Sequence, residues 1–158
     1  MTTLMQLLVF PALVGSALMA GVFFTFSAFV MQALAKLPAG EGIRAMRTIN
    51  QVILNPWFLS SFLGTALLSA CIGLFSILGN QARGSIWFLL AAALYFFGTF
   101  LITGIKNVPM NNQLESIDDR NAKDYWRHYL KKWTAFNHIR TVTSLVAVLF
   151  YAVGLSLI

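Results

Sequence analysis

The chain has 158 residues, of which 58% are hydrophobic and only 10% are charged, and its formal net charge is +6. Soluble domains carry about 25% charged residues, so this composition excludes an ordinary cytosolic enzyme. A single cysteine, Cys71, excludes a disulfide-stapled secreted module, and basic residues that flank apolar stretches fit a membrane surface rather than a nucleic-acid partner.

Four stretches of the chain are free of charged residues, and a helix needs about 20 apolar residues to cross a bilayer. We therefore predict four membrane spans, at about residues 4–34, 57–78, 86–105 and 137–158. They form a single integral membrane domain over residues 1–158. The predicted fold is all-α: a transmembrane four-helix bundle with cytoplasmic amphipathic helical connections.

The basic residues predict how the spans are oriented. The connections 36–56 and 106–136 join spans one to two and three to four, so both lie on the same side of the membrane. Every Lys and Arg except Arg83 lies in these connections or in the first turn of span four. The positive-inside rule then predicts a multi-pass protein of the cell membrane, with both connections in the cytoplasm and both termini outside.

Both connections carry helical patterns. Apolar residues recur at helical spacing in 41–54, which predicts an amphipathic helix in the membrane interface that ends at Asn55 and Pro56. Pro109 predicts the end of span three, and residues 116–119 offer a new helix start. Since no breaker follows, one long helix is expected to rise from the cytoplasm into span four. One of its faces combines aromatic and polar residues: Trp126, Trp133, Asn137, Arg140 and Ser144.

Polar residues gather at the cytoplasmic end of the spans. Amides at membrane depth are costly unless they are paired, so they normally face a bundle interior or a cavity. Taken singly, Asn55, Asn111 and Asn112 are explained by helix capping and turns, and Arg140 by the interface. As a group they predict one polar cavity, and its members are Asn50, Asn55, Asn107, Asn111, Asn112, Asn137, His138 and Arg140.

His138 stands apart from the rest of this group. On a helix it points about 100° away from Asn137 and about 160° away from Arg140, so it flanks their stripe. The spans contain no acidic residue, and neither histidine has a metal-ligand spacing. This argues against a metal centre and against Ser-His-Asp catalysis. A structural hydrogen bond and a functional role both stay open for His138.

Short motifs along the chain resemble the anthrone-oxygenase-like family of small four-span membrane proteins, most of which have no known role. The resemblance covers nearly the whole chain, in the expected order. Its motifs are Gly21–Ser27, Val30–Met31, Ala45–Met46, Asn50, Asn55–Phe58, Gly104, Asn107–Asn112, Trp126, Tyr129, Trp133–Thr134 and Asn137–Thr141. It implies an oxygenase that converts polyketide anthrones to anthraquinones without a metal or flavin.

The chemistry that this resemblance implies needs few groups. An anthrone loses a proton from an activated carbon to give an electron-rich enolate, which can react with dioxygen directly. The protein must supply a base, donors for the enolate oxygen and a dry apolar cavity. We expect His138 to be the base and Arg140 to stabilise the oxyanion. The expected substrate-binding residues are Asn107, Asn111, Asn112, Asn137, Trp133, Asn55 and Phe26.

Two other classes of function stay open. A haem-binding membrane protein would use His138 as an axial ligand, and a homodimer would supply two such ligands. A non-catalytic protein would use the polar end to dock a lipid, a quinone or a partner protein. No cofactor is expected for the oxygenase, whereas haem would give a Soret band in the absorbance spectrum. The expected partners are the lipid bilayer and, for the oxygenase, an apolar aromatic small molecule.

Overall fold

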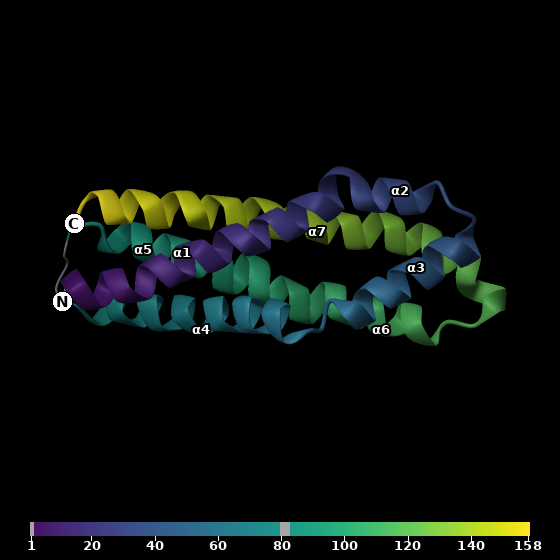
Figure 1. The fold of residues 1–158 in the computed structure, drawn as a ribbon, viewed down its shortest axis with the longest axis horizontal. Helices are drawn as coiled ribbons and strands as arrows, with labels where there is room; N and C mark the ends of the chain where they lie inside the picture. Colours follow the sequence, from purple (N-terminus) through teal and green to yellow (C-terminus); the bar gives the residue numbers. More distant parts are fainter. Residues whose placement is uncertain (1, 80–82) are drawn as a thin grey trace.

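The computed structural model describes residues 2–79 and 83–158, with residues 2 and 119–121 described by their backbone only, and this part of the chain is almost entirely helical (Figure 1). Three segments are π-helical (η) and the others are α-helical. In chain order the elements are α1 (Thr2–Thr25), η1 (Phe26–Val30), α2 (Met31–Ala35), α3 (Ala39–Val52), α4 (Pro56–Leu78), α5 (Ser85–Ala93), η2 (Leu94–Leu101), η3 (Thr103–Asn107), α6 (Val108–Ser116) and α7 (Asp119–Ser156).

Four continuous helices in the described residues are long and apolar enough to cross a membrane, which confirms the four predicted spans. They cover Thr3–Ala35, Pro56–Leu78, Ser85–Ser116 and Ala122–Ser156. Both termini lie at one end of the bundle, and the α2–α3 and α6–α7 connections lie at the other (Figure 1). We call these the terminal end and the loop end. The chain is a multi-pass membrane protein.

The prediction that span three ends at Pro109 is wrong, because the helix continues through this proline to Ser116. Proline lacks an N–H and crowds the carbonyl four residues before it, which normally breaks an α-helix. Here the π-helical segment η3 leads directly into the proline, and the N–H of Val108 bonds to the carbonyl of Thr103, five residues back. The wider turn accommodates the ring, so the helix is not interrupted.

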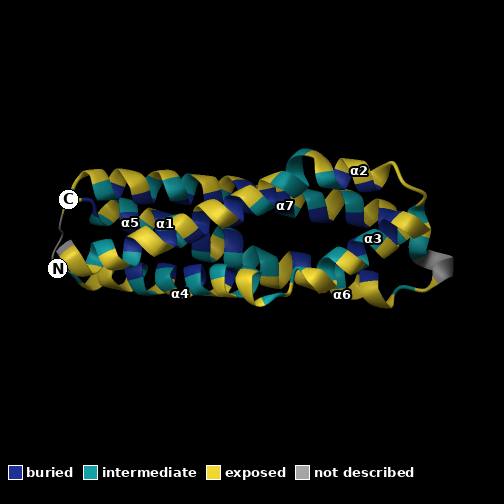
Figure 2. Cartoon of the chain, viewed as in Figure 1, coloured by how far each residue is buried: buried dark blue, intermediate teal, exposed yellow. Residues whose placement is uncertain are grey.

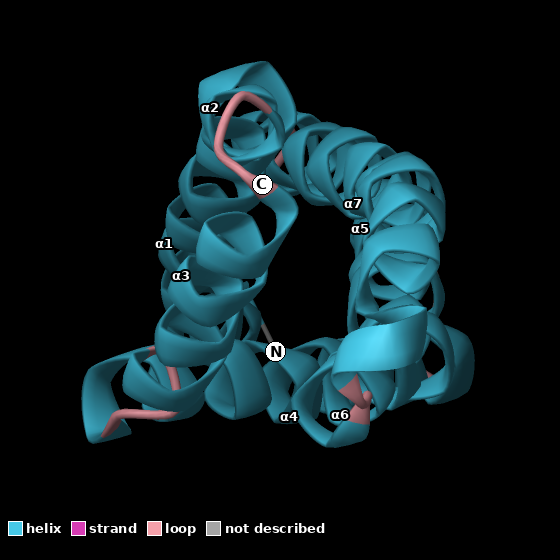
Figure 3. Ribbon diagram, turned by 90° about the vertical axis from the view of Figure 1, so that its right-hand side faces the viewer, coloured by secondary structure: helices cyan, strands magenta, loops and turns pink. Residues whose placement is uncertain are grey.

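The four long helices form a ring in which each contacts two neighbours. The neighbouring pairs are α1 with α4, α4 with α5, α5 with α7, and α7 with α1 (Figure 3). Buried residues face inward and exposed residues face outward along the bundle (Figure 2). The outward face carries large exposed apolar side chains such as Leu7, Leu67 and Leu149. Such a face is stable in contact with the hydrocarbon of a lipid bilayer.

The helix predicted at residues 41–54 is present as α3, and it packs against α6 and α7. Ile43 and Met46 are buried in the loop-end core, where they meet Trp126 and Trp133 of α7. Arg47 of α3 donates hydrogen bonds to the carbonyl oxygens of Leu114 and Ile117, which fixes the end of α6. The predicted face of α7 is also confirmed, since all five of its residues are buried: Trp126, Trp133, Asn137, Arg140 and Ser144.

Candidate active site

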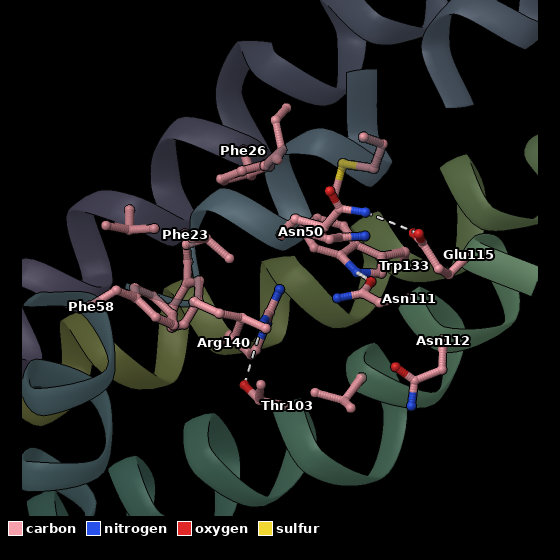
Figure 4. Close-up of a pocket in the computed structure, with 17 residues that line it drawn as sticks. Phe23, Phe26, Asn50, Phe58, Thr103, Asn111, Asn112, Glu115, Trp133 and Arg140 are labelled. Carbon is pink, nitrogen blue, oxygen red and sulfur yellow. Dashed lines mark hydrogen bonds between the residues drawn. The ribbon is translucent and has the colours of Figure 1, made fainter. Parts of the chain in front are cut away.

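A cavity of about 360 Å³ lies where the loop-end helices meet the ring of four spans (Figure 4). Its wall is mostly aromatic and aliphatic, with a few polar groups, which is typical of a small-molecule site. It is lined by Val22, Phe23, Phe26, Met46, Ile49, Asn50, Gln51, Ile53, Leu54, Phe58, Thr103, Val108, Asn111, Asn112, Glu115, Trp133 and Arg140.

Arg140 supplies the positive charge of the cavity wall, although the residue is only 4% exposed. Its Nη1 donates to the hydroxyl of Thr103 at 3.2 Å, and its Nη2 donates to Oδ1 of Asn137 at 2.7 Å. Its Nε is buried without a hydrogen-bond partner. Among the described residues Arg140 forms no ion pair with a carboxylate. A buried charge is costly unless it is paired, so this guanidinium favours the binding of an anion in the cavity.

Two aromatic rings hold the guanidinium of Arg140. Its Cζ lies 4.3 Å from the ring centroid of Phe23 and 5.0 Å from the ring centroid of Trp133. Phe26 packs against Trp133 with 5.6 Å between ring centroids. These contacts compensate part of the lost hydration through cation–π attraction, and they leave the charge facing an aromatic space.

Asn137 ties Arg140 to the first span. Its Nδ2 donates to the carbonyl oxygen of Phe23 and to the hydroxyl of Ser27, each at 2.7 Å. Ser27 lies in the π-helical segment η1, and its hydroxyl also lies 3.0 Å from that of Thr141. π-helical turns often occur at functional sites, and here η1 supplies Ser27 as a partner of Asn137 and η3 supplies Thr103 as a partner of Arg140.

The loop end of the cavity is bordered by amides. Oδ1 of Asn111 accepts hydrogen bonds from the Tyr129 hydroxyl and from Nε1 of Trp133, both at 2.7 Å. Asn50 of α3 lines the same region, and its Nδ2 is buried without a partner. This part of the wall therefore offers amide N–H groups to a ligand.

Gln51 and Glu115 border the cavity where it opens toward the surface. Nε2 of Gln51 donates to Oε1 of Glu115 at 3.0 Å, so this bond joins α3 to α6. Both residues are exposed. Glu115 is the acidic side chain among the described residues that line the cavity.

The structure brings together five of the nine residues predicted for the site, namely Phe26, Asn111, Asn112, Trp133 and Arg140. Asn137 and Asn107 lie behind the wall. Asn137 holds Arg140, and Nδ2 of Asn107 donates to the backbone oxygen of Trp133 at 3.2 Å. Asn55 does not reach the cavity but caps α4, where its Oδ1 accepts from the N–H of Phe58.

His138 does not line the cavity. Its side chain is exposed on the outer face of α7, next to the buried stripe that holds Asn137 and Arg140. The expectation that this histidine would act as the base in the cavity therefore lacks the required geometry. A haem bound through His138 would likewise lie on the outside of the bundle. Within the described residues no three side chains of His, Cys, Asp or Glu are grouped to hold a metal ion.

Several lining residues were not among those predicted for the site, and the sequence held signals for some of them. Asn50 belonged to the polar group, and Phe23 and Phe58 lie within the family motifs. Glu115 follows Asn111 by four positions, so the two share one face of a helix. The sequence did not indicate that Gln51 lines the cavity, because its position depends on how α3 packs against α6.

The pattern of one known protein family, described as anthrone oxygenase, matches residues 56–150 of the chain. No curated protein and no solved structure matches it. The family match begins at the start of α4 and extends into the last turns of α7, so it contains Thr103, Asn111, Trp133, Asn137 and Arg140. Because the match covers more than half of the sequence, the chain belongs to the anthrone oxygenase family.

Proposed function

We propose that this protein is an oxygenase of apolar aromatic substrates of the anthrone class, and that the reaction takes place in the cavity beside Arg140. The observation that carries the proposal is a buried guanidinium that faces an aromatic space without a carboxylate partner. Family membership supports the same reaction class.

In this proposal the carbonyl oxygen of the substrate binds at Arg140. When the activated carbon across the ring loses a proton, negative charge develops on that oxygen. The Nε–H of Arg140 has no other partner, so it is available to the developing oxyanion. Donors placed in advance at a developing charge give one of the largest contributions to enzyme catalysis.

The walls of the cavity suit the rest of such a substrate. Phe23, Phe26, Phe58 and Trp133 give aromatic contacts, and Val22 and Met46 add aliphatic surface. A volume of about 360 Å³ is within the range of small-molecule sites. An apolar wall also keeps bulk water from the enolate, which strengthens its interaction with the buried guanidinium.

We assign the proton-accepting role to Glu115. It is the carboxylate among the described lining residues, and its exposure lets water carry the proton away from the cavity. The hydrogen bond from Gln51 to Oε1 fixes its position. A carboxylate is a weak base for a carbon acid, so the transfer depends on stabilisation of the enolate by Arg140.

The oxygen chemistry then balances without a further reactant. The enolate carbon gives electrons to dioxygen and forms a carbon–oxygen bond. The resulting peroxide takes up a proton and becomes a hydroperoxide at that carbon. Loss of the remaining proton from this carbon breaks the oxygen–oxygen bond and releases hydroxide, which takes up a proton to become water. One dioxygen is consumed, the ring carbon is oxidised to a carbonyl, and the products are an anthraquinone and water.

The experiment that tests this proposal is oxygen uptake by the purified protein in lipid nanodiscs with anthrone as substrate. We expect uptake above the uncatalysed rate, with one anthraquinone formed for each dioxygen consumed. Anthrone that oxidises no faster with the protein than without it would contradict the proposal.

We further propose that the loop end faces the cytoplasm. All described basic residues except Arg83 and the buried Arg140 lie at or near this end, and cytoplasmic segments of membrane proteins carry an excess of Lys and Arg. The substrate would then enter the cavity from the cytoplasmic side of the membrane, past Gln51 and Glu115.

A further inference from the structure

The cavity wall contains more hydrogen-bond donors than the chain uses. The Nε of Arg140 and the Nδ2 of Asn50 are buried without partners. Both side-chain hydrogen bonds of Asn111 to described residues are accepted by its oxygen, so its Nδ2 donates none to them. Unsatisfied buried donors are uncommon in native proteins and call for a ligand or water.

The orientation of the Asn111 amide is fixed by its partners. The indole nitrogen of Trp133 is a donor only, so the atom of Asn111 that meets it at 2.7 Å must be the oxygen. Since the hydroxyl of Tyr129 donates to the same oxygen, the NH₂ group is left for the cavity. Figure 4 shows Asn50, Asn111 and Arg140 around the same space, with Trp133 among them.

Arg140 and Asn111 both lie beside the indole of Trp133. The Cζ of Arg140 is 5.0 Å from its ring centroid, and Oδ1 of Asn111 is 2.7 Å from its Nε1. A fused-ring ligand placed along this indole can therefore meet Arg140 at one edge and the amides at another. Because the free groups at both places are donors, they select oxygen acceptors on the ligand.

We propose that Asn50 and Asn111 form a second oxygen-binding pair, which receives the oxygen that the reaction introduces. This inference rests on the proposed function, and it extends the site from one oxygen to two. If the first carbonyl of the substrate binds at Arg140, the reacting carbon lies across the central ring and faces the amides. The peroxide formed there accepts hydrogen bonds from the two NH₂ groups, and so does the carbonyl that replaces it.

The same pair sets the preference among ligands. Anthracene has no oxygen, anthrone has one, and anthraquinone has two at opposite edges of its central ring. A site with donors at both ends binds anthraquinone more tightly than anthrone. This difference depends on Asn50 and Asn111, whereas the difference between anthrone and anthracene depends on Arg140.

Two substitutions remove the pair while keeping the fold. Asn111→Asp retains the oxygen that accepts from Tyr129 and Trp133 but replaces the NH₂ donor with a charged oxygen, which repels the carbonyl oxygen of a ligand. Asn50→Leu removes a buried amide nitrogen that makes no hydrogen bond within the chain, and the Tm of the variant shows whether the bundle stays folded. Gln113→Leu is the matched control, since Gln113 is an exposed amide of α6 outside the cavity wall.

The test measures the Kd of anthracene, anthrone and anthraquinone for each variant in nanodiscs under nitrogen, so that anthrone is not oxidised. We expect Asn50→Leu to lose affinity for anthraquinone by about fivefold to tenfold, as for one or two hydrogen bonds, with little change for anthrone. Asn111→Asp should lower the anthraquinone-to-anthrone affinity ratio by at least as much. Gln113→Leu should keep the parental values.

An unchanged anthraquinone-to-anthrone affinity ratio in both variants would overturn the inference. Failure of the proposed function has a different signature, because it would be seen as parental protein that does not accelerate anthrone oxidation. The binding ratio is measured without oxygen, so the two failures are separated.

Discussion

Nη2 of Arg140 donates a 2.7 Å hydrogen bond to Oδ1 of Asn137, one turn earlier on α7. The amide nitrogen of Asn137 is in turn bonded to Phe23 and Ser27 in the first span. A neutral amide, and not a carboxylate, therefore holds this buried guanidinium. The arrangement orients Arg140 without neutralising it, so its charge remains available to a ligand in the cavity.

Asn137→Leu tests the structural side of this relationship. The substitution leaves one N–H of the buried guanidinium without its partner and breaks the link between α1 and α7. We expect a loss of about 2–4 kcal/mol in the free energy of unfolding. Thermal unfolding in detergent measures it as a lower Tm, with Gln113→Leu as a control on the exposed surface. A parental Tm for Asn137→Leu would mean that this link does not stabilise the bundle.

Glu115→Gln tests the proton acceptor. The oxygen of the new amide still accepts the hydrogen bond from Gln51, so the contact between α3 and α6 is kept. Only the ability to take a proton is lost, and we expect turnover to fall by about 10²-fold or more. The measurement is the initial rate of oxygen uptake with anthrone. If Glu115→Gln keeps the parental rate, solvent takes the proton and Glu115 has no catalytic role.

His138→Ala separates the sequence-based hypothesis from the structural one. A base in the cavity would lose about 10²–10⁴-fold in turnover when removed. Because His138 is exposed on the outer face of α7, we expect its replacement to leave turnover within about twofold of the parent. The same variant should show an unchanged absorbance spectrum. A large loss of turnover, or the loss of a Soret band, would contradict this expectation and show that His138 has a functional role.

The helical bundle was predictable because lipid imposes strong constraints. The length of the charge-free stretches predicted the spans, and the positions of Trp126, Trp133, Asn137 and Arg140 predicted the buried face of α7. The continuation past Pro109 was not predictable. It depends on the π-helical turn at Thr103–Asn107, and sequence patterns at a helical period of 3.6 do not show such a turn.

The candidate site was predictable only in part. The angle of His138 on the helix already indicated that it points away from Arg140, and the structure agrees with that angle. Asn55 was included because it is polar and lies near the same end, but the cap of α4 accounts for it. Glu115 and Gln51 were missed because they meet only when α3 folds back onto α6. Pairing of distant segments is not visible in local sequence patterns.

The orientation of the bundle can be tested by labelling. In a Cys71→Ala background, we expect the thiol of a Lys123→Cys variant to react with membrane-impermeant reagents only after the cells are opened. The thiol of a Ser156→Cys variant should react in intact cells. The expectation follows from the basic residues at the loop end, and Ser156 lies at the other end of α7. The reverse labelling pattern would place the termini in the cytoplasm.

The most direct test of the account compares oxygen uptake with anthrone for the parent and for Arg140→Gln, with the anthraquinone product quantified alongside. Glutamine keeps an amide donor near Thr103 and Asn137 but removes the charge, and the Tm of the variant shows whether the bundle stays folded. The account predicts that turnover falls by about 10²–10³-fold in a folded variant, as when a donor to a developing oxyanion is removed. Parental oxygen uptake by folded Arg140→Gln would contradict it.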